Sequence, residues 1–336
     1  MNSRKILKIF FLFGRNLCNL RSQRSGVALF RYRSSRFPRS LTNVSSLSPV
    51  AAFGVAPYPY AVENPSNLGY TYSMTEVNQT LFIPLYGKAK VSRQGIIIKD
   101  SMAEKIWDAE AFEVHGKSKS KWLTYNMAMR AKIFDDWVEK MLAQNPEALV
   151  LHIGCGLDSR AFRIAAPYSN WIDGDFPEVL EARKKYYSEN EHYKMMAFDA
   201  SKSEMVEKLP DAKTVIVVFE GISMYLRNEE LNAFVRALDK KFSQVHMLLD
   251  VYTVFGAKAS KYKNPINDVG VTSVWGLDDI NLVLAGTQFK CDAEHSLTPD
   301  NLVKQLPPFD RGFFKFLFTG SFYRKIYRLY EISKTL

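Results

Sequence analysis

Hydrophobic side chains repeat with two different periods along this chain, and the two periods alternate from about residue 100 onward. In residues 101–114 and 118–142 apolar side chains recur every three or four positions, which predicts two helices, the second ended by Asn145-Pro146. Residues 148–153 then form a short, almost continuous apolar run bounded by glycine. Such a run is typical of a central parallel strand that is covered on both faces.

The same alternation continues toward the C-terminus. Strands and helices that alternate in this way build a doubly wound parallel sheet with right-handed crossovers, so the predicted fold class is α/β and Rossmann-like. Further strands are predicted at 171–173, 193–198, 214–219 and 244–251, and further helices at 177–187 and, capped by Asn228, at 228–242. The aromatic and basic segment 313–330 is expected to form a lid helix and a final strand, 323–330, at the sheet edge, with a membrane-facing surface as the alternative.

The net charge of the chain is concentrated in its first 62 residues. The 336 residues carry a formal net charge of +10, but residues 1–62 contain ten basic side chains and no acid. Subtracting these ten from 45 leaves 35 Lys and Arg, which balance the 35 Asp and Glu of the remaining chain. A basic groove for nucleic acid is therefore not expected in the folded part.

Residues 1–73 are expected to lie outside the folded domain. We expect a non-structural leader or disordered tail on a cytoplasmic protein, with Met74 as a possible true start. The alternative is an organellar, mitochondrial transit peptide, because such peptides are rich in Arg and Ser and poor in acids. The apolar run 9–13 is far shorter than the roughly 20 residues that span a bilayer, so no integral membrane segment is expected.

Cysteine and histidine are too few and too scattered for a metal or disulfide framework. The three cysteines, Cys18, Cys155 and Cys291, form no CxxC pattern, and the five histidines have no HxxH or HxxxH spacing. We expect no metal site. His152 lies within an apolar run and is expected to be a core histidine.

Polar and glycine residues gather directly after the predicted strands. Ligands of doubly wound sheets bind at the carboxyl ends of the strands, so these residues predict the binding site. They are Gly154, Gly156, Asp173, Asp175, Asp199 and Glu220.

The glycine turn after the first strand lacks part of the dinucleotide fingerprint. The third glycine of that fingerprint would stand three residues after Gly156, where this chain has Ser159. Asp158 stands in the same turn, where a carboxylate would repel a diphosphate. The turn therefore favours a nucleoside ligand without phosphates.

Two acids lie at the distance from this turn at which a carboxylate can accept hydrogen bonds from ribose hydroxyls. Asp173 and Asp175 follow Gly154 by 19 and 21 residues. Asp199 is placed to accept from the exocyclic amine of adenine. A ribose, an adenine and no phosphate fit S-adenosyl-L-methionine, whose sulfonium tolerates acidic neighbours.

Several motifs follow one another in a fixed order. They are GCGLDSR at 154–160, WIDGDFPEV at 171–179 and FEGISMYL at 219–226, preceded by 80–89 and 130–135. Together, from about Met74 to the C-terminus, they resemble the leucine carboxyl methyltransferase family, which includes the tetracenomycin-type polyketide O-methyltransferases. The resemblance implies a class I methyltransferase sheet at 146–336 with an N-terminal helical cap at 74–145.

The resemblance also implies a role for individual residues. Asp175, rather than Asp173, would hold the ribose hydroxyls, and Arg130, assisted by Lys88, would pair with the methionyl carboxylate. Asp173 stands where the family commonly has Glu, and Ala200 replaces a frequent Leu. The full set of implied cofactor-binding residues is Lys88, Arg130, Gly154, Gly156, Asp175, Asp199, Ala200 and Glu220.

Each of the implied roles has a plainer alternative. Arg130 could be a solvated helix residue, Asp199 could cap the following turn, and Asp175 could cap the helix after it. Tyr225 and His115 are candidates to line an acceptor pocket.

The function expected from these observations is O-methylation. The acceptor would be a carboxylate or a hydroxyl of a small molecule or a peptide C-terminus, and an ionised carboxylate would need no general base. The alternatives are an NAD-dependent oxidoreductase, which Ser159 disfavours, and a non-catalytic adenosyl-binding scaffold. The sequence identifies neither the acceptor, nor a catalytic residue, nor the oligomeric state.

Overall fold

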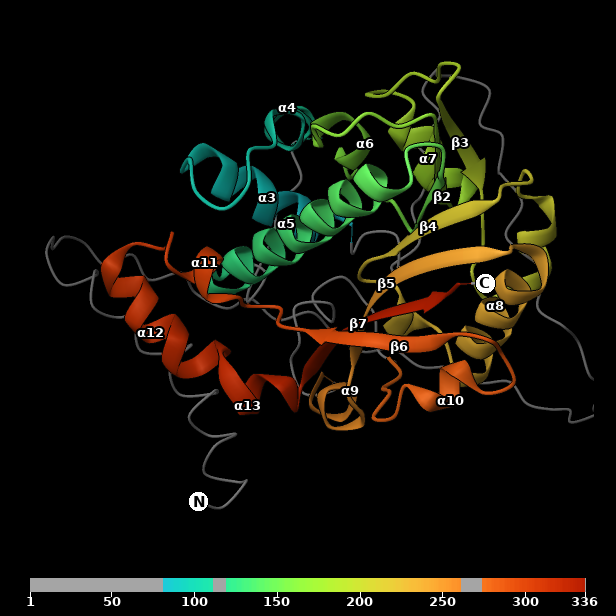
Figure 1. The fold of residues 1–336 in the computed structure, drawn as a ribbon. Coiled ribbons are helices and arrows are strands. Elements are labelled where there is room, and N and C mark those ends of the chain that lie inside the picture. Colours follow the sequence, from blue (N-terminus) through green and yellow to red (C-terminus); the bar gives the residue numbers. More distant parts are fainter. Residues whose placement is uncertain (1–80, 111–118, 261–273, 336) are drawn as a thin grey trace, which may run out of the picture. The chain divides into compact units, whose positions relative to one another are not determined.

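A seven-stranded sheet with the order β3-β2-β1-β4-β5-β7-β6 organises the fold (Figure 1). The structure is a computed structural model that describes residues 81–110, 119–260 and 274–335. The strands are β1 (Leu149–Ile153), β2 (Asn170–Asp175), β3 (Tyr193–Ala197), β4 (Thr214–Phe219), β5 (Gln244–Tyr252), β6 (Lys290–His295) and β7 (Tyr327–Lys334).

The sheet is mixed rather than wholly parallel. Strands β1 to β5 are parallel, as predicted, whereas β7 runs antiparallel to both β5 and β6. The prediction of a final strand at 323–330 on the sheet edge was wrong in two respects: β7 begins at Tyr327, and β6 covers its outer side. The edge strand β6 has the polar sequence KCDAEH, so no apolar run revealed it. The α/β, doubly wound fold class is confirmed.

Helices precede and connect the strands. Most predicted helices are present within a few residues of the expected bounds. The helices are α3 (Phe82–Arg93), α4 (Ser101–Glu110), α5 (Lys121–Gln144), α6 (Arg160–Arg163), α7 (Pro177–Arg183), α8 (Asn228–Lys241), α9 (Val254–Ser260), α10 (Asn281–Leu284), α11 (Asp300–Val303), α12 (Pro308–Phe318) and α13 (Gly320–Arg324), with short 3-10 turns η2 (Ser203–Lys208) and η3 (Ser223–Tyr225).

The cap of α8 differs from the prediction. Arg227, not Asn228, is the N-cap, and Asn228 is the first helical residue. The reason is Glu230, whose Oε2 accepts a hydrogen bond from the Arg227 backbone N–H at 2.8 Å, in the manner of a capping box. None of the helices in the described ranges combines the length and apolar character needed to cross a bilayer.

Alternate residues of the parallel strands belong to two separate hydrophobic clusters. Val150 packs with Phe134 and Trp137 of α5, whereas Leu149 and Leu151 belong to the cluster that contains Phe234 of α8. Side chains of a strand point alternately to opposite faces, so α5 and α8 cover opposite faces of the sheet. The helices predicted as a cap thus share a core with the strands, and the division at 145/146 stays a prediction.

The order of strands fixes where a ligand can approach. β1 lies between β2 and β4. From the adjacent strands β1 and β4 the chain winds outward in opposite directions, to β2 and β3 on one side and to β5 on the other. The crevice at such a switch point, outside the carboxyl ends of the strands, is where doubly wound folds bind ligands. Gly154 follows β1 and Glu220 follows β4, at this point of the sheet.

Candidate functional site

The turn after β1 depends on two glycines in the left-handed backbone region. Gly154 has φ 70° and Gly156 has φ 52°. A Cβ on Gly154 would lie 2.3 Å from Cγ2 of Ile222, so no other residue fits there without displacing the loop after β4. The turn consequently presents bare backbone at the carboxyl end of β1.

Asp175 lies at the end of β2 and holds this turn. Its Oδ2 accepts a hydrogen bond from the Gly156 N–H at 2.7 Å, and its Oδ1 accepts from the Phe176 N–H at 2.7 Å. The side chain is half-buried, and burial raises the pKa of Asp175 to about 6. Each oxygen has further acceptor capacity beyond its single N–H, which suits a ligand that donates two neighbouring hydroxyls.

Asp173, two residues earlier on the same strand, is fully buried and already paired. Oδ1 accepts from Trp171 Nε1 at 2.8 Å and contacts His152 Nδ1 at 3.1 Å, while Oδ2 accepts from Tyr193 Oη at 2.7 Å and forms an ion pair with Arg183. Burial alone would raise the pKa of Asp173, but Arg183, together with the contacts from His152 and Trp171, outweighs it and lowers that pKa to about 2. This carboxylate is part of the core, which favours Asp175 for contact with a ligand.

Arg130 of α5 reaches the end of β4. Its Nε donates to Glu220 Oε1 at 2.9 Å, and its Nη1 donates to Tyr327 Oη at 2.8 Å and Asp250 Oδ2 at 3.1 Å. Nη2 faces Gly221, where an added Cβ would lie 2.9 Å away. Among the described residues none accepts a hydrogen bond from Nη2, so its two N–H donors remain for a ligand anion.

Glu220 lies between two arginines. Oε1 pairs with Arg130, and Oε2 accepts from Arg160 Nη2 at 2.5 Å. Burial alone would raise the pKa of Glu220, but Arg160 and Arg130 outweigh it and lower that pKa below its ordinary value. Glu220 is therefore ionised and held, rather than free beside the site.

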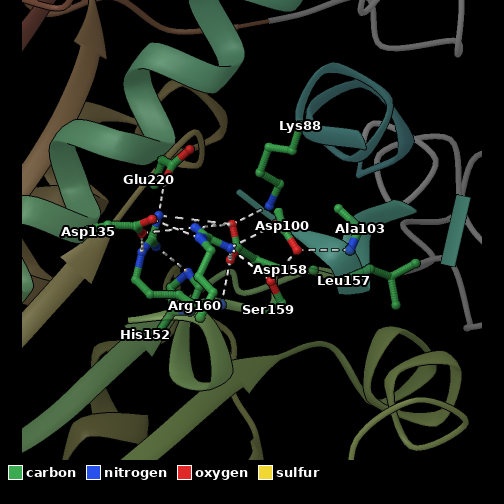
Figure 2. Close-up of polar contacts among 12 residues, drawn as sticks. Lys88, Asp100, Ala103, Asp135, His152, Leu157, Asp158, Ser159, Arg160 and Glu220 are labelled. Atoms are coloured by element: carbon green, nitrogen blue, oxygen red, sulfur yellow. Dashed lines mark hydrogen bonds and ion pairs between the residues drawn. The ribbon is translucent and has the colours of Figure 1, made fainter. Parts of the chain in front are cut away.

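Lys88 of α3 is buried and forms an ion pair with Asp158 (Figure 2). Asp158 also accepts from Arg163 Nη1 at 2.6 Å and from the Arg160 backbone N–H at 2.7 Å. The expectation that this carboxylate would repel a diphosphate was therefore wrong, because two cations neutralise it. Ser159 is buried and donates to Asp100 Oδ1 at 2.6 Å, so it is a structural residue of the turn.

Asp199 lies in the loop after β3, at the same edge of the sheet as Asp175. It accepts from the Ser201 N–H at 3.0 Å and from Ser201 Oγ at 2.6 Å, which is the turn-capping contact considered as its plainer role. Burial opposes the change, but the Ser201 hydrogen bonds prevail and lower the pKa of Asp199. Ala200 is partly buried against the cluster that contains Ile172 and Phe198.

Other residues singled out in the sequence have structural positions or lie outside the described ranges. His152 is buried, and burial lowers its pKa, as fits a core histidine. Tyr225 lies in η3, and His115 falls outside the described residues. Within the described ranges, no group of three or more His, Cys, Asp or Glu side chains is arranged to hold a metal ion.

Three residues that contact Arg130 or Glu220 were not identified as site residues from the sequence: Asp250, Tyr327 and Arg160. Asp250 is a lone charge inside the apolar strand β5, and this contrast is a signal that could have identified it. It is fully buried and accepts from the Gly221 N–H at 2.6 Å. Tyr327 lies 197 residues from Arg130, and no local pattern connects them.

The donor set fits the adenosyl ligand expected from the sequence. Asp175 offers a carboxylate for a diol, Arg130 offers a charged donor for a carboxylate, and the glycine turn offers open backbone. A second cation, Lys88, retains two N–H donors beyond its pair with Asp158. These features come from β1, β2, α3 and α5, which the fold brings together.

Comparison with known proteins gives a consistent pattern. A family model described as leucine carboxyl methyltransferase matches residues 78–239. The tetracenomycin polyketide synthesis O-methyltransferase TcmP of Streptomyces glaucescens is 30% identical over 215 residues, covering 62% of this chain and 78% of that protein. The S-adenosyl-L-methionine-dependent methyltransferase dpfgK of Gibberella zeae is 24% identical over 232 residues, covering 62% of this chain and 77% of that protein.

Solved structures are similar at a lower level. A DUF574 family protein from Streptomyces avermitilis has a TM-score of 0.46 at 13% identity, covering 70% of this chain and 90% of that one. The magnesium protoporphyrin IX methyltransferase of Synechocystis with bound SAH has a TM-score of 0.42 at 12% identity, covering 77% of this chain and 100% of that one. With both TM-scores below 0.5, the fold class rests on the strand order of the sheet itself.

Proposed function

Because the chain belongs to the leucine carboxyl methyltransferase family and is an S-adenosyl-L-methionine-dependent methyltransferase, we propose that it methylates an oxygen atom of its acceptor. The acceptor is a carboxylate or hydroxyl of a small molecule or of a peptide C-terminus. The relative TcmP is named an O-methyltransferase, which supports oxygen as the atom methylated.

One observation carries the proposed mode of cofactor binding. An anionic acceptor, Asp175, stands at the carboxyl end of β2, and a buried cation with remaining donors, Arg130, reaches the carboxyl end of β4, so the two flank β1 at the same edge of the sheet. Asp175 would hold the ribose hydroxyls, and Arg130, with Lys88, would hold the methionyl carboxylate. Glu220 would lie near the methionyl end, Gly154 and Gly156 would allow close approach, and Asp199 with Ala200 would face the adenine.

When bound, the cofactor supplies an electrophilic methyl group on a sulfonium. The residues named above bind and orient it, and alignment of reacting groups is the principal source of rate enhancement in such a displacement. A carboxylate acceptor is already ionised at neutral pH, so the protein has no proton to remove. A hydroxyl acceptor would need a base. We favour the carboxylate.

The acceptor can be identified by label transfer. The protein is incubated with cofactor tritiated on its methyl group and a fractionated cell extract, and the labelled product is isolated. Mild alkali should release the label as methanol, because an ester hydrolyses and an ether does not. Label that resists alkali would exclude the carboxylate. The Asp175→Asn variant is the matched control and should transfer little label.

Calorimetric titration tests the cofactor assignment separately. S-adenosyl-L-methionine and S-adenosylhomocysteine should both bind, whereas NADH should not. Binding of NADH alone would support the oxidoreductase alternative and refute the proposal. Binding of the adenosyl ligands without label transfer from any fraction would support a scaffold instead.

The compartment forms a further part of the proposal. A cytoplasmic location is expected. Import into the mitochondrion is the alternative, and it is supported by residues 1–62, which contain ten basic side chains and no acid. Fusing residues 1–73 to a fluorescent reporter discriminates the two. Import of the reporter would refute the cytoplasmic expectation.

A further inference from the structure

Arg160 is a fully buried arginine whose three nitrogens each contact a different element. Nε donates to Asp135 Oδ1 of α5 at 2.7 Å, and Nη2 donates to Glu220 Oε2 after β4 at 2.5 Å. Nη1 contacts His152 Nε2 of β1 at 3.1 Å. Figure 2 shows the guanidinium among these side chains.

These contacts close a ring around the proposed methionyl end of the site. Arg130 and Asp135 lie five residues apart on α5. Arg130 holds one oxygen of Glu220 directly, and Asp135 holds the other through Arg160. Glu220 is thus fixed to α5 twice, and neither of its oxygens can turn away without leaving a buried guanidinium N–H, Nε of Arg130 or Nη2 of Arg160, without its acceptor, which is costly.

We propose that Arg160 is a positioning residue for the cofactor: it orients the Glu220 carboxylate and, through it, the guanidinium of Arg130. This inference rests on the proposed function, because it concerns the end of the site assigned to the methionyl group. Without Arg160, Glu220 is free to take a bidentate contact with Arg130 through Nε and Nη2, which occupies one of the two Nη2 N–H donors left for the ligand and turns the guanidinium toward Glu220.

His152 supports this role by fixing the third nitrogen of Arg160. A guanidinium can only donate, so His152 Nε2 accepts from it, and the single proton of the ring lies on Nδ1 and points to Asp173. Burial lowers the pKa of His152, which keeps the ring neutral and keeps this acceptor in place.

A purely structural role for Arg160 is the rival explanation, and Arg163 provides the matched control for it. Arg163 pairs with the same Asp135, at 2.7 Å, and its side chain is 6% exposed compared with 0% for Arg160. It also pairs with Asp100 and Asp158, but not with Glu220 or Arg130. A lysine substitution at either position disturbs the same buried cluster, whereas only the one at Arg160 touches Glu220.

The test compares two ligands with the full-length protein. S-adenosylhomocysteine carries the amino-acid group, and 5′-methylthioadenosine lacks it. Arg160→Lys should weaken S-adenosylhomocysteine about ten-fold, because lysine cannot supply the fork of donors, and leave methylthioadenosine within two-fold of wild type. Arg163→Lys should change neither by more than about two-fold. Equal losses for both ligands, no loss for either, or the same selective loss in Arg163→Lys would each overturn the proposal.

A double-mutant cycle with Glu220→Gln tests whether Arg160 acts on the ligand through Glu220. If Arg160 acts through Glu220, then Arg160→Lys should cost little further affinity in the Glu220→Gln background. Additive losses would refute that route. Arg160→Lys could fail to fold. In that case Asp135→Asn, which removes the carboxylate charge that pairs with Nε of Arg160, should produce the same ligand-selective loss. Wild-type protein that binds no S-adenosylhomocysteine would instead refute the proposed function.

Discussion

Two aspartates on one strand have pKa values that are shifted in opposite directions in this protein. Asp173 and Asp175 are separated by one residue of β2, yet the pKa of Asp173 is lowered to about 2 and that of Asp175 is raised to about 6. Burial, complete for Asp173 and partial for Asp175, favours the neutral acid in both. Asp173 gains a buried guanidinium, whereas Asp175 gains two backbone N–H groups.

The difference separates a carboxylate that stabilises the fold from one that is available to a ligand. The two oxygens of Asp173 already interact with four side chains of the core. Asp175 is held in place by its own backbone and by the glycine turn, and part of its surface remains accessible. Spacing along the chain cannot distinguish the two, because either distance from Gly154 suits a ribose acid.

The largest expected effect is on stability, at Asp173. Asp173→Asn leaves Arg183 buried without its anion, so the free energy of unfolding should fall by about 3–5 kcal/mol. Urea denaturation measures this, with Asp175→Asn as the control, expected to lose less than about 1 kcal/mol. Equal losses in the two variants would contradict the comparison.

The second effect is on cofactor affinity, at Asp175. Asp175→Asn should weaken S-adenosyl-L-methionine by about 10- to 100-fold, since hydrogen bonds to charged groups contribute about 1.5–3 kcal/mol. Wild-type protein should prefer adenosine to 2′,3′-dideoxyadenosine in competition calorimetry, and the variant should not. A variant that still discriminates the two ligands would assign the ribose to another residue.

A smaller effect is expected at Tyr193, which donates to Asp173 at 2.7 Å and accepts from Arg183 at 3.1 Å. Tyr193→Phe removes both of these hydrogen bonds to buried charged groups and should cost about 1.5–3 kcal/mol of stability. Cofactor affinity should not change, because Asp175 keeps its partners. Thermal unfolding and calorimetry on the same sample check both parts, and a tighter or weaker cofactor complex would show that the two carboxylates are coupled.

The smallest expected effect is a difference in pH dependence. The folded-state pKa of Asp175 lies above its ordinary value, so the folded state binds more protons between about pH 4 and 6 and this group makes stability fall as pH rises. The folded-state pKa of Asp173 lies below its ordinary value, so its contribution is present above about pH 4 and is lost as pH falls toward 2.

The two variants separate these contributions. Full expression of the change at Asp175 would correspond to about 3 kcal/mol, and solvent screening of a half-buried group reduces the expectation to about 1 kcal/mol. Denaturation of Asp175→Asn should therefore lack about this much of the decline between pH 4 and 6. A wild-type profile in that variant would show that Asp175 does not titrate in this range.

The sequence predicted the parallel part of the fold well and its closing strands poorly. Strand β4 has the predicted bounds, 214–219, because a continuous apolar run identifies a strand covered on both faces. Strand β6 was missed and β7 was placed four residues too early, since an antiparallel edge has polar side chains and its pairing depends on a distant partner.

The site shows the same division. The glycine turn and Glu220 could be identified because each directly follows an apolar run, whereas Asp175 was chosen over Asp173 from the register of the family motif. Arg160 lies within a quoted motif, yet nothing local indicates that its partners are Asp135 and Glu220, 25 and 60 residues away. The role expected for Asp158 was wrong for the same reason, because Lys88 is 70 residues distant.

The sequence by itself therefore determined the family, the α/β class and the strand ends at which the site lies, since these depend on hydrophobic period and on short motifs. The family resemblance favoured Asp175 over Asp173 without a physical reason, and only the tertiary structure decided which carboxylate is fully paired within the core and which one keeps acceptor capacity. That choice depends on which cations the fold brings within hydrogen-bond distance of each carboxylate, and those cations come from elements far apart in the chain.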